Sequence, residues 1–117
     1  MSAVANVLVA FVALLHLLFL VLEMFLWTKP FGRRTFGLTK ELADATAGLA
    51  ANQGLYNGFL AAGLIWGLVV GSFEVKVFFL VCVIVAGVFG AFTAKRSILF
   101  IQALPGALAL AAVIVAR

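Results

Sequence analysis

The sequence contains little cysteine and little charge, and each shortage excludes a class of protein. Its one cysteine, Cys82, has no second thiol for an internal disulfide or a CxxC motif, so a disulfide scaffold and a thiolate metal site are excluded. Charged residues make up 10% of the 117 residues, against about 25% in soluble domains. Because a soluble domain of this length cannot bury a chain that is 67% hydrophobic, the composition predicts an integral membrane protein with a single domain over residues 1–117.

Acidic residues are also few, four against eight lysines and arginines, which leaves a formal net charge of +4. The basic residues lie between apolar runs instead of following one solvated surface. We therefore expect anionic headgroups of membrane lipids as their partners, and no nucleic acid.

Four long apolar runs fill most of the chain: residues 3–27, 45–71, 77–94 and 98–116. Each run is close to the ~20 residues that a helix needs to cross a bilayer. The connections at 72–76 and 95–97 are short, so the helices that they join must be antiparallel. The sequence thus predicts an all-α fold, an integral membrane antiparallel four-helix bundle.

The distribution of basic residues predicts the orientation of this bundle. The first and third connections share one side of the membrane and carry six basic residues: Lys29, Arg33, Arg34, Lys40, Lys95 and Arg96. The other side carries Lys76 and Arg117. Since lysine and arginine are enriched on the cytoplasmic side, we expect a multi-pass protein of the cell inner (plasma) membrane with both termini outside.

The first connection also has an unusual composition. Its turn-forming residues are Pro30, Gly32 and Gly37. Phe31 and Phe36 flank the arginine pair, which predicts an interfacial hairpin with its rings among the headgroups. Thr39 is a candidate cap for a helix that starts before the membrane.

Strongly polar side chains inside the apolar runs are the best guide to function. They are His16, Glu23, Asn52, Gln53, Asn57 and Gln102, with Tyr56 and Thr93 beside them. An ionisable group at membrane depth costs about 2.5–3.5 kcal/mol on insertion scales. We therefore expect these groups to face one another in one intramembrane polar pocket, open toward the cytoplasm.

Helical phase supports this expectation. His16 and Glu23 are seven residues apart and share one face, but their separation of roughly 10.5 Å along the axis excludes a direct hydrogen bond. On the second run Asn52, Gln53, Tyr56 and Asn57 fall within an arc of roughly 140°. Pro105, which lacks an N–H, frees the carbonyl of Ile101 beside Gln102.

Small residues at every fourth position predict close helix packing. One row contains Ala50, Gly54, Gly58 and Ala62, and a second contains Ala86, Gly90 and Ala94. In membranes such rows let helix backbones approach each other, so we interpret both as structural.

Several stretches together resemble a known family. They are His16 with Glu23-Met24-Phe25-Leu26-Trp27, Gly32-Arg33, Phe36-Gly37, Ala51-Asn52-Gln53-Gly54-Leu55-Tyr56-Asn57-Gly58, and Gln102-Ala103-Leu104-Pro105. This pattern resembles the small membrane proteins of domain-of-unknown-function family 1304, over essentially the whole chain. The resemblance implies a four-span bacterial-type membrane protein and carries no activity.

Three classes of function fit these residues. The first is a pocket that binds or converts a small amphipathic or lipid-like molecule, in which Glu23 and His16 exchange protons with the ligand. Five further side chains would orient it: Asn52, Gln53, Tyr56, Asn57 and Gln102.

The alternatives are a proton-coupled small-molecule transporter that uses Glu23, and a structural or accessory membrane subunit. The transporter reading rests on a similarity in length and span count to the small multidrug resistance family, from which the position of Glu23 near one end of its span departs. One histidine with one glutamate is a poor metal site, so we expect no metal and no cofactor. The sequence leaves open whether a reaction is catalysed and whether the chain forms a homo-oligomer.

Overall fold

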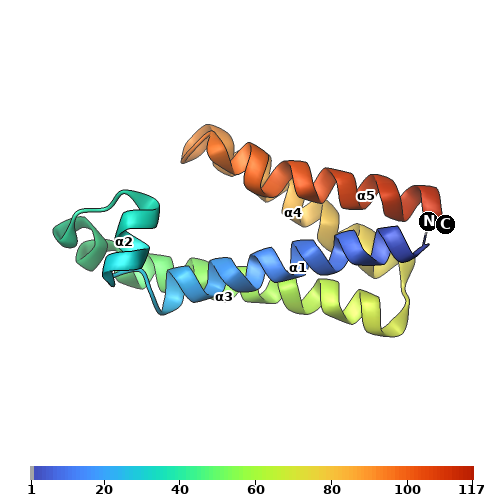
Figure 1. Ribbon diagram of the computed structural model, residues 1–117, viewed down its shortest axis with the longest axis horizontal. Coiled ribbons are helices and arrows are strands. Elements are labelled where there is room, and N and C mark those ends of the chain that lie inside the picture. The colour runs from blue at the N-terminus through green and yellow to red at the C-terminus, as the bar shows by residue number, and fades with distance from the viewer. Residues whose placement is uncertain (1) are drawn as a thin grey trace. The chain divides into compact units, whose positions relative to one another are not determined.

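The computed structural model describes residues 2–117, which form helices joined by short connections (Figure 1). The elements are α1 (Ser2–Met24), α2 (Pro30–Phe36), α3 (Lys40–Val70), α4 (Phe73–Thr93), the π-helix η1 (Leu99–Ala103) and α5 (Leu104–Ala116). Four stretches are long and apolar enough to cross a membrane: α1, α3, α4, and η1 continued by α5. The predicted all-α fold with four membrane helices is confirmed.

The ends of α1 and α3 follow from local hydrogen bonds. Beyond α1, the N–H groups of Phe25 and Leu26 both donate to the carbonyl of Val21, so the regular ladder stops. The N–H of Leu42 donates to the Thr39 hydroxyl at 3.1 Å, which confirms the predicted cap and starts α3 at Lys40. As a result α3 begins five residues before the predicted span 45–71.

The first connection contains a short helix, α2, so the prediction of a turn-marked hairpin was wrong. Pro30 occupies the first turn of α2, where its missing N–H costs nothing. Gly37 ends the helix in the left-handed conformation, with φ of 66°. Gly32 lies inside α2, and a Cβ there would come 1.7 Å from the Leu26 carbonyl oxygen. The glycine is needed for close approach and not for a turn.

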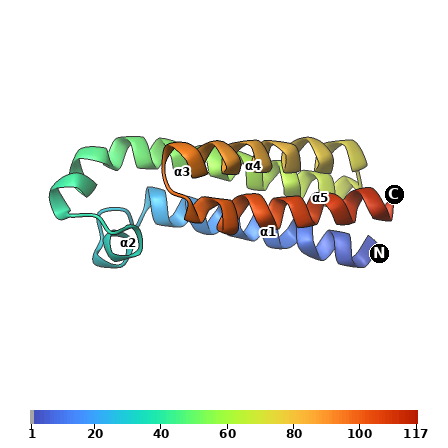
Figure 2. The same cartoon turned by 90° about the horizontal axis from the view of Figure 1, so that it is seen from above.

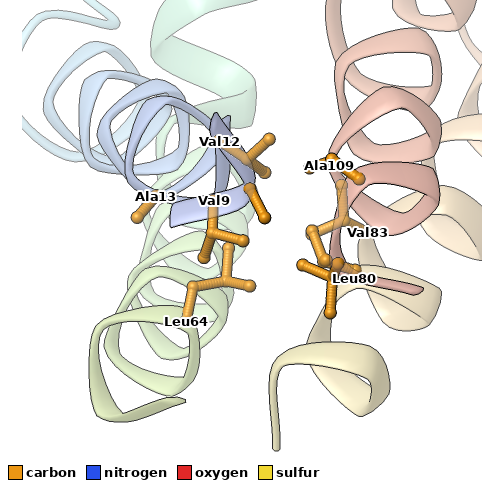
Figure 3. Packing of buried hydrophobic residues seen from close by; sticks show 10 residues of the cluster. Val9, Val12, Ala13, Leu64, Leu80, Val83 and Ala109 are labelled. Carbon is orange, nitrogen blue, oxygen red and sulfur yellow. The ribbon is translucent and has the colours of Figure 1, made fainter. Parts of the chain in front are cut away.

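Two compact units divide the chain, and the first contains residues 2–14 and 60–117. It includes the start of α1, the end of α3, α4, and η1 continued by α5, and these successive segments run alternately in opposite directions (Figure 2). Figure 3 shows the core of this unit, with Val9, Val12 and Leu64 opposite Leu80 and Val83.

Within this unit α4 and the η1–α5 segment pack closely. A Cβ at Gly87 would lie 2.9 Å from the backbone nitrogen of Ala103, so glycine allows the two helices to touch. Val83, Gly87 and Ala91 form the buried face of α4. The predicted row Ala86, Gly90 and Ala94 is wrong as a packing face, because Ala86 and Ala94 are exposed. The face of α4 that contacts its neighbours is the one that contains Val83, Gly87 and Ala91.

The second unit contains residues 15–59: the end of α1, α2 and the start of α3. Here α1 and α3 are antiparallel, and an added Cβ at Gly54 would lie 2.6 Å from Met24 Cγ. The Trp27 indole nitrogen donates to the Thr46 hydroxyl at 3.0 Å, and its ring lies 4.9 Å from the ring of Phe36. Trp27 thereby contacts both α2, through Phe36, and α3, through Thr46.

Candidate functional site

The second unit brings together one carboxylate and one amide of the predicted site. Glu23 lies in the last turn of α1 and is half-buried. The side-chain amide of Asn57, on α3, is 7% exposed and donates a hydrogen bond of 2.5 Å to Glu23 Oε1. A carboxylate that accepts from a neutral amide keeps its capacity for further donors, because it offers about four acceptor positions.

Glycines on α3 allow this pair to form. A Cβ at Gly54 would lie 3.2 Å from Glu23 Cβ, and one at Gly58 would lie 2.7 Å from Leu20 Cδ1. These two glycines flank Asn57 and bring the α3 backbone close to α1. Such close approach through small residues is the usual basis of helix association in membranes.

His16 lies two helical turns before Glu23 on the same helix and is fully buried. Its ring packs edge-on against Phe19, with ring centroids 5.2 Å apart. His16 therefore occupies the predicted inward stripe of α1, together with Val9 and Val12, which are also buried.

Three of the predicted ligand-binding residues lie on an exposed face of α3. Asn52 and Gln53 are exposed, and Tyr56 is 52% exposed with its ring 6.0 Å from that of Phe59. Asn57, and not Asn52, is the α3 residue hydrogen-bonded to Glu23. The α3 polar arc thus divides into one inward amide and three outward side chains.

Gln102 belongs to the first unit, where its side chain has a structural contact. Its amide nitrogen donates to the backbone carbonyl of Val83 at 3.0 Å and links η1 to α4. The N–H of Leu104 donates to the carbonyl of Leu99, five residues earlier, which is the π-helical pattern. The chain bends into this pattern directly before Pro105, whose ring nitrogen cannot donate to Ile101.

Two polar contacts were not predicted from the sequence. One is the bond from Trp27 to Thr46 in the second unit. The other is in the first unit, where the ammonium of Lys76 donates to the Asn6 side-chain oxygen at 2.9 Å. Asn6 is a strongly polar residue inside the first apolar run, and that signal could have drawn attention to it.

The side chains of the candidate site are hydrogen-bonding and proton-exchanging groups. Within residues 2–117 no group of three or more histidine, cysteine, aspartate or glutamate side chains is arranged to hold a metal ion. Glu23 can accept hydrogen bonds or exchange a proton, and the exposed amides and phenol of α3 can donate and accept. These are the abilities needed to recognise a small polar group.

Comparison with known proteins identifies relatives. A family model described as "Protein of unknown function (DUF1304)" matches residues 10–114, a range that includes every residue of the candidate site. The chain is similar to the uncharacterized protein YpaA of Lactococcus lactis subsp. lactis (strain IL1403), with 29% identity over 118 residues that cover 97% of each protein. No solved structure matches the chain.

Proposed function

This chain belongs to the DUF1304 family of proteins of unknown function, and from its own residues we propose that it binds a small amphipathic or lipid-like molecule within the membrane. The observation that carries the proposal is the bond between Asn57 and Glu23 at the end of a membrane helix. A carboxylate in such a helix is costly, and intramembrane ionisable groups commonly mark functional sites.

Glu23 supplies the contact for the polar part of the ligand. Asn57 provides one donor to its carboxylate, and the remaining acceptor positions suit a hydroxyl or an amine of the ligand. Because Asn57 is buried and Glu23 half-buried, the carboxylate is held in one position before the ligand arrives. A fixed carboxylate loses less entropy on binding than a mobile one.

The exposed polar face of α3 extends this contact. Of the four helices that could cross a membrane, α3 is the least apolar. The side chains of Asn52, Gln53 and Tyr56 are expensive against hydrocarbon, so a polar headgroup that covers them stabilises the complex. The neighbouring exposed apolar residues Leu49 and Phe59 suit the apolar part of the same molecule.

Conversion of the ligand would use the same residues. Glu23 would exchange a proton with the bound molecule. His16, the second titratable group on that face of α1, is fully buried, so a direct contact with the ligand is assigned to Glu23 alone. We assign Gln102 a packing role, because its amide is bonded to the carbonyl of Val83.

The test compares three forms of the protein in mild detergent: wild type, Glu23→Gln and the control Glu41→Gln. Glu41 is an exposed glutamate in the first turn of α3, so the control makes the same chemical change outside the site. Mass spectrometry measures the amphipathic molecules that copurify, and a thermal melt reports folding.

We expect Glu23→Gln to lose the copurifying molecule while its melting temperature stays near that of wild type, because glutamine still accepts the bond from Asn57. Glu41→Gln should retain the molecule. Equal retention by both variants would contradict the proposal and favour a purely structural role for Glu23.

A further inference from the structure

A cavity of about 210 Å³ lies in the first unit, and Glu23 is not among its lining residues. It is open to the surface and is lined by the start of α1, the start of α4 and the end of α5, with Asn6, Phe73, Lys76, Val113 and Arg117 among its residues. Since a water molecule takes a share of roughly 30 Å³, the cavity has room for a phosphate group with part of its ester.

Two cationic side chains line this cavity. Lys76 donates to the uncharged Asn6 oxygen at 2.9 Å, so an ammonium with three donors keeps two for another partner. The guanidinium of Arg117 lies 4.1 Å from the centre of the Phe73 ring, which holds it at the mouth. Glu74 approaches Arg117 at 3.9 Å, but both side chains are mostly exposed, so this ion pair neutralises little of the charge.

The cavity also lies at the ends of helices that could cross a membrane, which is where a spanning helix meets lipid headgroups. It is built from the terminal turns of three helices that are long and apolar enough to cross a bilayer. Lys76 lies one turn inside the start of α4, so its side chain reaches toward the interface. Val113 and Phe73 add an apolar wall beside the cations.

We propose that this cavity binds the phosphate group of an anionic phospholipid. Lys76 and Arg117 contact the phosphate oxygens, and Val113 and Phe73 contact the first carbons of the glycerol and acyl chains. The site is independent of Glu23 and its ligand.

The test uses the full chain in nanodiscs that contain phosphatidylglycerol and phosphatidylcholine. Native mass spectrometry measures which lipid stays bound on release, and a phosphatidylglycerol with a photoreactive group near its glycerol maps the contact. The variants are Lys76→Gln, Lys76→Arg as the charge-preserving form, and Lys95→Gln as the matched control. Lys95 is an exposed lysine in the connection after α4 and does not line the cavity.

We expect wild type to retain phosphatidylglycerol over phosphatidylcholine, and Lys76→Gln to reduce this retention about tenfold, as expected for a lost charged hydrogen bond. Lys76→Arg and Lys95→Gln should retain it, and crosslinks should map to Phe73 or Val113. Equal loss in Lys76→Gln and Lys95→Gln, or crosslinks elsewhere, would overturn the site. A second arm adds inorganic phosphate to lipid-free protein in detergent. A rise in melting temperature that requires Lys76 would overturn the phospholipid as the source of the anion.

Discussion

The contact between Glu23 and Asn57 places an ionisable group and an amide against each other in a segment built for a membrane. In such surroundings the hydrogen bond stabilises both partners, because a buried polar group that loses its hydration without gaining a hydrogen bond costs free energy. The pair therefore predicts one effect on stability through Asn57 and, if the proposed function is correct, a separate effect on ligand binding through Glu23.

Replacing Asn57 with leucine tests the stability effect. We expect Asn57→Leu to lower the free energy of unfolding by about 1–3 kcal/mol, because it leaves the Glu23 oxygen without its donor. Asn52→Leu is the matched control, since Asn52 is exposed and should change stability little. Reversible unfolding in detergent measures both. A larger loss for Asn52→Leu would show that the outward face of α3 carries the packing.

The sequence predicted that Glu23 has polar partners on α3, but it did not predict that Asn57 is the residue hydrogen-bonded to Glu23. Depth counted from the ends of the apolar runs puts Asn52 closer to the level of Glu23 than Asn57 is. The connection between α1 and α3 holds a helix of its own, and α3 starts at Lys40, so the register between the two helices differs from that estimate. Asn57 reaches Glu23 instead. Helical phase could be read from the sequence, whereas register across a structured connection could not.

At the scale of elements, the contact between α1 and α3 in the second unit depends on small residues. We expect Gly58→Leu to lower the free energy of unfolding by roughly 1–3 kcal/mol, because a Cβ at this position would already lie 2.7 Å from Leu20 Cδ1. The change is measured as a lower melting temperature in detergent. Gly48→Leu is the control, since a Cβ at Gly48 meets nothing within 4 Å. Equal melting temperatures for the two variants would place the Gly58 face against lipid.

The short helix α2 provides a second prediction at this scale. A Cβ at Gly32 would collide with the Leu26 carbonyl, so Gly32→Ala should release α2 from its position next to Trp27. Trypsin should then cut after Arg33 or Arg34 faster than in wild type. Gly48→Ala serves as the control and should leave the cleavage rate unchanged. An unchanged rate in Gly32→Ala would mean that α2 is not held in this way.

Its turn residues alone could not have predicted α2. Proline and glycine signal a chain reversal wherever they occur, yet Pro30 also fits the first turn of a helix and Gly37 its end. The deciding contacts are tertiary: the Trp27 ring lies against the ring of Phe36 at a tilt, and the indole N–H of Trp27 donates to Thr46. Such contacts lie 9 and 19 residues apart in the chain and leave no periodic signal.

At the scale of the whole molecule, composition predicted the membrane class, and the four apolar runs predicted the number of membrane helices. A chain that is 67% hydrophobic, with its charges collected between the apolar runs, leaves few other folds. The same count of charges predicts the orientation, with Arg33, Arg34, Lys95 and Arg96 at the cytoplasmic headgroups and both termini outside.

Cysteine labelling tests this orientation. In a Cys82→Ser background, Thr35→Cys should be protected from an impermeant maleimide in intact cells and labelled in inverted vesicles. Ser2→Cys should give the opposite pattern and serves as the control. Labelling of the Thr35 position from outside would reverse the predicted topology.

The most direct test of the proposed function is an experimental structure of the protein in a native lipid extract. We expect density for a non-protein amphipathic molecule whose polar end lies within hydrogen-bond distance of Glu23 and of an α3 side chain such as Asn52 or Gln53. A structure in which other protein groups cover these side chains, and Glu23 contacts Asn57 and protein alone, would contradict it.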